Sequence, residues 1–195
     1  MNKKIYDDLL NNRIKFYSYS NDKKNENYNL SNSLILSGSF NPLHEGHIEL
    51  LNASSKEFKK NPLFEISITN VDKSEINFID LMDRINQFKS LGNLVITNSA
   101  KFEEKSMLFQ ESIFVIGYDT ALRLVDNKYY NDDFRKSLKI IEKNNCSFLV
   151  SGRFLNKEYK KPNNINFEGY DYMFNILSEE KFRVDISSTE LRRLR

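Results

Sequence analysis

Cysteine, tryptophan and histidine are nearly missing from this chain of 195 residues, which has one Cys, no Trp and two His. One cysteine cannot form an internal disulfide, and this fits a reducing, cytoplasmic compartment. No apolar stretch approaches the length of a membrane span, and the N-terminus lacks the apolar core of a signal peptide, so we expect no membrane insertion. The formal charge of +2 gives no general reason to expect nucleic-acid or membrane binding.

Two common phosphate-binding loops are missing as well. The sequence has no G-x-x-x-x-G-K-[ST], which excludes a P-loop, and no G-x-G-x-x-G, which excludes the standard dinucleotide loop. A protein-built zinc site is a poor fit, because His44 and His47 supply only two ligands and Cys146 is distant in the sequence. We therefore assign no metal-ligating residues.

The composition that remains suits a soluble globular protein, with 39% hydrophobic and 13% aromatic residues. The length fits one domain, or one domain with an extension. From Ser33 onward, apolar strand-like runs alternate with helical patterns, which predicts a parallel sheet with crossover helices. The predicted strands are Leu34–Ser37, Phe64–Thr69, Asn93–Thr97, Ile113–Gly117, Ser147–Ser151 and Phe182–Val184. The predicted helices are His47–Lys59, Leu81–Leu91 with Gly92 as its C-cap, Thr120–Val125 and Asp132–Asn144. Lys101–Phe109 is either a short helix or irregular. The fold class is α/β: a Rossmann-like, doubly wound parallel sheet with helices on both faces, in a single domain.

Residues 1–30 differ in character from the rest. A weak helical pattern of apolar residues opens the chain, and residues 20–27 are polar enough for a loop. We interpret residues 1–30 as a helical extension and linker that packs one short helix on the domain or on a partner. Residues 31–195 form the main domain.

Both histidines lie in the stretch around which the chain is organised. The predicted strand ending at Ser37 is followed by a turn containing Gly38, Pro42 and Gly46, and then by a helix. A strand, a tight loop and a helix N-terminus make a phosphate site, because the first helical amides are unpaired and carry partial positive charge. The alternative is that His44 merely caps the helix and His47 packs on its inner face.

Three further loops are predicted at the same edge of the sheet. Residues 69–73 follow the second strand, Gly117-Tyr118-Asp119 follows the fourth, and residues 186–193 follow the last strand and open a final helix. In doubly wound sheets, ligands bind beyond the carboxyl ends of the strands, at the switch point. We expect these loops and the histidine loop to form one pocket. An N-cap role for Asp119 is the alternative at its position.

Two motifs resemble those of one enzyme superfamily. Residues 38–47, Gly-Ser-Phe-Asn-Pro-Leu-His-Glu-Gly-His, resemble the HxGH signature of the nucleotidylyltransferases, and residues 38–42 have the form seen in nicotinamide mononucleotide adenylyltransferases. Residues 186–192, Ile-Ser-Ser-Thr-Glu-Leu-Arg, resemble the second signature, ISSTxxR. The resemblance covers residues 33–195 and implies the Rossmann-like fold and transfer of AMP from ATP to a phosphate-bearing acceptor, with release of pyrophosphate.

The resemblance also implies roles for residues. The catalytic set is His44, His47 and Arg192. The nucleotide-binding set is Gly38, Ser39, Phe40, Gly46, Gly117, Asp119, Ile186, Ser187, Ser188 and Thr189, where Asp119 would bond the ribose. The acceptor-side set is Asn70, Lys73 and Arg84. Such a transfer needs no enzymatic nucleophile, because the acceptor's phosphate oxygen attacks directly, so the protein's task is alignment and charge neutralisation.

The two motifs do not identify the acceptor molecule. Nicotinamide or nicotinate mononucleotide is expected, in NAD biosynthesis, with Mg2+ bound mainly through the triphosphate. The nicotinamide ring usually stacks on aromatic residues, often Trp, which this chain lacks; Tyr118, Phe78, Phe102, Tyr129 or Tyr130 could substitute. A cytidylyltransferase, a pantetheine-phosphate adenylyltransferase and a non-catalytic nucleotide-binding regulator are the alternatives, and self-association into a homo-oligomer is not determined.

Overall fold

A computed structural model describes residues 1–19, 24–25, 29–71, 74–126, 134–155 and 158–183. Helices within these residues are α1 (Lys3–Leu10), α2 (Glu45–Glu57), α3 (Phe78–Asn86), α4 (Phe102–Leu108), α5 (Tyr118–Leu124) and α6 (Phe134–Lys143), with short 3₁₀ turns at Pro162–Asn164 and Asp171–Met173. Strands are β1 (Phe16–Tyr19), β2 (Lys24–Asn25), β3 (Ser33–Ser37), β4 (Asn61–Ser67), β5 (Leu94–Thr97), β6 (Ile113–Gly117), β7 (Ser147–Ser151), β8 (Arg153–Leu155), β9 (Glu158–Lys160) and β10 (Phe174–Leu177).

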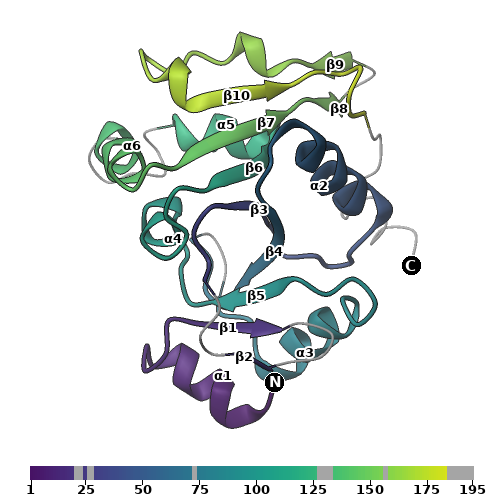
Figure 1. Ribbon diagram of the computed structural model, residues 1–195, viewed down its shortest axis with the longest axis vertical. Coiled ribbons are helices and arrows are strands. Elements are labelled where there is room, and N and C mark those ends of the chain that lie inside the picture. The colour runs from purple at the N-terminus through teal and green to yellow at the C-terminus, as the bar shows by residue number, and fades with distance from the viewer. Residues whose placement is uncertain (20–23, 26–28, 72–73, 127–133, 156–157, 184–195) are drawn as a thin grey trace.

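The described strands β1–β7 and β10 form one sheet in the order β10-β7-β6-β3-β4-β5-β1-β2 (Figure 1). The six strands from β10 to β5 are all parallel. Numbered along the chain, these six have the spatial order 3-2-1-4-5-6 of the doubly wound dinucleotide fold, whose switch point lies between β3 and β6. The predicted fold class is confirmed.

Helices cover both faces of the sheet (Figure 1). One hydrophobic cluster joins the sheet to α1, α2 and α3, and includes Leu9, Leu50 and Ile85. A second cluster on the opposite face joins it to α5 and α6 through residues such as Ala121 and Leu138. The strands are buried on both sides, which explains their nearly continuous apolar sequences. Within the described residues, no helix is long and apolar enough to cross a membrane.

The N-terminal segment contributes more than the predicted helix. Strand β1 pairs antiparallel with β5, so that Phe16 lies opposite Thr97 and Tyr19 opposite Leu94. Tyr17 is buried, and α1 adds Tyr6 and Leu9 to the core. Residues 16–19 are therefore a strand of the main sheet, and the helix of residues 3–10 packs against that sheet.

The last parallel strand lies earlier than the sequence predicts. Residues 182 and 183 are not in a strand, residue 184 lies outside the described residues, and β10 occupies Phe174–Leu177 instead. Its two middle residues are exposed because it is an edge strand, and so it shows neither an alternating nor a continuous apolar pattern. Phe174 fixes it by stacking between Phe148 and Phe167, with ring centroids 4.9 Å and 3.8 Å away.

The predicted element ends differ by a few residues. Helix α3 begins three residues before the predicted Leu81 and ends at Asn86; Gly92, at φ 66°, closes the turns that follow rather than the helix. Strand β4 ends at Ser67, two residues short of prediction, and α5 begins at Tyr118, directly after β6. The loops that follow β3, β4 and β6 remain at the carboxyl edge of the sheet.

Candidate active site

The histidine loop, residues 38–47, is anchored in the core by Phe40. The Phe40 ring is buried and makes edge contacts with Phe64 and Phe88, at centroid distances of 5.6 Å and 5.2 Å. Its backbone has a positive φ of 43° and turns the chain back over Gly38. A Cβ on Gly38 would lie 2.9 Å from the Phe40 ring, which explains why glycine is needed at the end of β3.

Gln87, at the end of α3, holds the histidine loop from outside. Its amide oxygen accepts from the Leu43 N–H at 2.8 Å, and its amide nitrogen donates to the Phe40 carbonyl at 3.0 Å. Arg84, one turn earlier on the helix, donates to the Ser39 carbonyl at 3.1 Å. No local pattern indicates Gln87, because it lies more than 40 residues from the loop that it binds.

The two histidines stack on each other at the start of α2. Their ring centroids are 3.8 Å apart, and the His44 backbone N–H donates to Nδ1 of His47 at 3.3 Å. A neutral imidazole that accepts at Nδ1 carries its proton on Nε2, so His47 is a donor at Nε2. His44 is the N-cap residue, and Phe40 meets the His47 ring edge-on at 5.0 Å. His44 therefore stands at the cap position and His47 packs against Phe40, as the alternative interpretation of these residues expects.

Both histidines are held in the neutral form. Burial, followed by the proximity of His44, lowers the pKa of His47 to about 4. Burial also lowers the pKa of His44. Nδ1 of His44 is buried and has no hydrogen-bond partner among the described residues. Without a ligand the two histidines are therefore neutral hydrogen-bond donors. A negative charge bound nearby would raise the pKa of both.

A cleft of about 410 Å³ adjoins this loop at the carboxyl edge of β3 and β4. Its volume is within the range of ligand pockets, roughly 300–1,000 Å³. The lining includes Gly38 and Ser39 from the histidine loop, Asn70 after β4, and Arg84 from α3. Two predicted acceptor-side residues, Asn70 and Arg84, therefore line the cavity that reaches the histidine loop.

The floor of this cleft contains two charged residues that the sequence analysis missed. Glu65 on β4 is fully buried, and its carboxylate pairs with the ammonium of Lys105 from α4. The Thr97 hydroxyl donates to the other carboxylate oxygen at 2.6 Å. A charged residue inside an otherwise apolar strand is the one feature of the sequence that could have indicated Glu65. Its partner Lys105 is 40 residues away and could not be identified from spacing.

The loop after β6 contains Asp119, for which the sequence allowed two roles, and the structure excludes one of them. The N-cap of α5 is Gly117, so the N-cap role considered for Asp119 is wrong. The Asp119 carboxylate pairs instead with the guanidinium of Arg153 on β8, and both side chains are about 40% exposed. A Cβ on Gly117 would meet no described atom within 4 Å, so the backbone there is open to a ligand.

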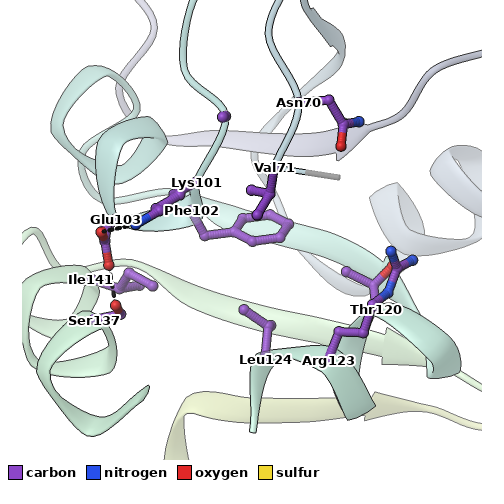
Figure 2. A pocket seen from close by; sticks show the side chains of 11 residues that line it. Asn70, Val71, Lys101, Phe102, Glu103, Thr120, Arg123, Leu124, Ser137 and Ile141 are labelled. Carbon is purple, nitrogen blue, oxygen red and sulfur yellow. Dashed lines mark hydrogen bonds and ion pairs between the residues drawn. The ribbon is translucent and has the colours of Figure 1, made fainter. Parts of the chain in front are cut away.

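A second, smaller cavity of about 190 Å³ lies beyond the cleft, between the sheet edge and α4, α5 and α6. Figure 2 shows the Phe102 ring projecting into its middle, towards Val71, with Thr120 and Arg123 on the far side. The two cavities share Asn70 and Ala100, so they adjoin. An elongated ligand could extend from the histidine loop to Phe102.

The remaining predicted site residues lie outside the described part of the chain. They are Lys73 on the acceptor side, the whole second signature (Ile186, Ser187, Ser188, Thr189 and Arg192), and the aromatic candidates Tyr129 and Tyr130. Within the described ranges, no three His, Cys, Asp or Glu side chains gather to hold a metal ion.

Comparison with known proteins gives two matches. A model of the cytidylyltransferase-like family matches residues 35–194. A probable nicotinate-nucleotide adenylyltransferase of Endomicrobium trichonymphae is 26% identical over 163 residues, which cover 82% of this chain and 83% of that protein. The family match begins within β3 and spans the histidine loop, the cleft and the second signature.

Proposed function

This chain belongs to the cytidylyltransferase-like family, and from that premise we propose that it transfers AMP from ATP to a mononucleotide acceptor and releases pyrophosphate. Nicotinate or nicotinamide mononucleotide is the proposed acceptor. The observation that carries the proposal is the stacked, neutral His44–His47 pair at the N-terminus of α2, in a loop whose first residues line the cleft at the carboxyl edge of β3 and β4.

In the proposed reaction the acceptor's phosphate oxygen attacks the α-phosphorus of ATP, and the bond from that phosphorus to pyrophosphate breaks. His47 donates from Nε2 to a non-bridging oxygen of the α-phosphate as charge develops there, and His44 assists it. The positive end of the helix dipole at the start of α2 stabilises the same charge. Mg2+ would enter with the nucleotide and neutralise the triphosphate, as this ion keeps water ligands and binds through substrate phosphates.

The choice of acceptor rests on the form of the two adjoining cavities and on the similarity to a protein described as a nicotinate-nucleotide adenylyltransferase. The cleft is rich in hydroxyl and amide groups, including Ser39, Thr69 and Asn70, which suit a ribose phosphate. The second cavity offers an aromatic face at Phe102, which suits a ring. A mononucleotide has both parts.

Pyrophosphate release tests the proposal. ATP and CTP are each paired with nicotinate mononucleotide, nicotinamide mononucleotide and phosphopantetheine, with His47→Ala as the inactive control. We expect release with ATP and one of the two pyridine mononucleotides only, and dependence on both substrates. Release with CTP but not with ATP would contradict the proposed nucleotide. Release with phosphopantetheine but with neither pyridine mononucleotide would contradict the proposed acceptor. A folded protein that is inactive with every pair would favour a non-catalytic nucleotide-binding role.

A further inference from the structure

The buried ion pair beneath the cleft carries more hydrogen-bonding capacity than the protein uses. The Lys105 ammonium has three donors, yet among the described residues it donates only to Glu65, at 2.5 Å. The neighbouring Ser37 hydroxyl, also on the floor, is buried and has no partner in the described part of the chain. Unused donors that line a cleft favour an acceptor oxygen, and a ligand oxygen that replaces water there gains a hydrogen bond to a charged group.

The location of the pair separates it from an ordinary structural ion pair. Both Lys105 and Glu65 line the cleft, although their side chains are only 7% and 0% exposed. A buried ion pair is often no more stabilising than apolar residues of similar size, so stability alone gives little reason for one. The Thr97 hydroxyl and Lys105 occupy both oxygens of Glu65, which fixes the ammonium in place.

The floor lies between two ends of an elongated site. At one end, Arg84 from α3 donates to the carbonyl of Ser39 in the histidine loop. At the other, the Phe102 ring is 5.7 Å from the Lys105 ammonium and projects into the second cavity (Figure 2). A phosphorylated riboside with its phosphate near Arg84 and its ring near Phe102 would place its sugar over Lys105.

We propose, building on the proposed function, that Lys105 binds the acceptor by donating to a ribose hydroxyl, and that Glu65 is the positioning residue that holds the ammonium in the cleft floor. The pair would thereby select acceptors that carry a hydroxylated sugar between phosphate and ring. Phosphopantetheine, which has no ribose, would not use this contact.

The test removes both charges together, because removal of one leaves the other buried and unpaired. In the double variant Glu65→Gln/Lys105→Met, the glutamine can still accept from Thr97. The matched control is Glu57→Gln/Lys181→Met, which removes a surface pair of the same residue types. Calorimetry measures the Kd of nicotinate and nicotinamide mononucleotide, and of ATP, for each protein, so the test does not require turnover.

We expect the double variant to bind the mononucleotide at least about tenfold more weakly, as for loss of a hydrogen bond to a charged group. ATP affinity should stay within about twofold, and the control variant should match the wild type. A 2′- or 3′-deoxy acceptor should show a similar loss with the wild type and no further loss with the double variant. Unchanged acceptor affinity, an equal deoxy penalty in both proteins, or no binding of either mononucleotide by the wild type would overturn the inference. Wild-type binding without pyrophosphate release would reject only the proposed function.

Discussion

The histidine loop and the cleft floor lie beside each other at the ends of β3 and β4, yet they are built in opposite ways. The loop is a continuous segment, residues 38–47, in which Phe40 packs against His47 and anchors the turn in the core, and α3 ties only its backbone from outside. The floor is assembled from β4, β5 and α4, whose contributing residues are distant in the sequence. A contiguous site can therefore be identified as a motif, whereas an assembled one becomes visible only when the sheet is formed.

The largest change in stability is expected when one residue of the buried ion pair in the cleft floor is replaced. Lys105→Met leaves the Glu65 carboxylate buried without its cation, which should lower the free energy of unfolding by about 3–5 kcal/mol. Denaturant unfolding at pH 7 measures it. The double variant Glu65→Gln/Lys105→Met should recover more than half of that loss. A single variant as stable as the wild type would show that the carboxylate is not sealed by the fold.

The histidine loop should respond to pH. The pKa of His47 is about 4 in the folded protein, below its unfolded value near 6.5, so the unfolded state takes up the proton first. The stability that His47 contributes is present above pH 6.5 and is lost as the pH falls from 6.5 towards 4, by roughly 2–3 kcal/mol. His44 acts in the same direction. Comparing the wild type with His47→Asn at pH 7 and pH 4.5 should show a smaller decrease for the variant; equal decreases would contradict the neutral pair.

Gln87, at the end of α3, ties the histidine loop to a distant part of the sequence. Gln87→Ala leaves the Leu43 N–H and the Phe40 carbonyl without their partner, so unfolding free energy should fall by about 1–3 kcal/mol and pyrophosphate release should slow. Asn86→Ala, at the neighbouring exposed position, is the control. If both variants behave like the wild type, the loop holds its geometry without α3.

These contrasts explain how much could be predicted from the sequence. The parallel strands β3, β6 and β7 and the phosphate-loop layout follow from continuous apolar runs and from glycine placement, so they were predicted closely. Strands β1 and β10 were missed, because each is only four residues long and lies at the edge of the sheet or next to it, where the apolar pattern is weak. Gln87, Glu65 and Lys105 were missed because their roles depend on partners at least 32 residues away. The assigned roles of the predicted site residues remain predictions.

The smallest effect concerns Asp119. If its carboxylate bonds the ribose of ATP, Asp119→Asn should raise the KM for ATP by about tenfold and lower maximal turnover less. Stability should change by less than about 1 kcal/mol, because Gly117 is the helix cap and the pair with Arg153 is exposed. Arg153→Ala removes the same ion pair and leaves the carboxylate in place, so the KM for ATP should not rise. Equal increases in both variants would assign the effect to the ion pair instead.

Turnover is the measurement that decides the claim that nucleotidyl transfer takes place at the stacked histidines. Turnover of ATP and the active mononucleotide to pyrophosphate is compared between the wild type and His47→Ala, with thermal unfolding of both at pH 7. Loss of a single donor to a developing oxyanion should reduce turnover by on the order of a hundredfold or more, while the protein remains folded. A folded His47→Ala protein with turnover near that of the wild type would contradict the claim.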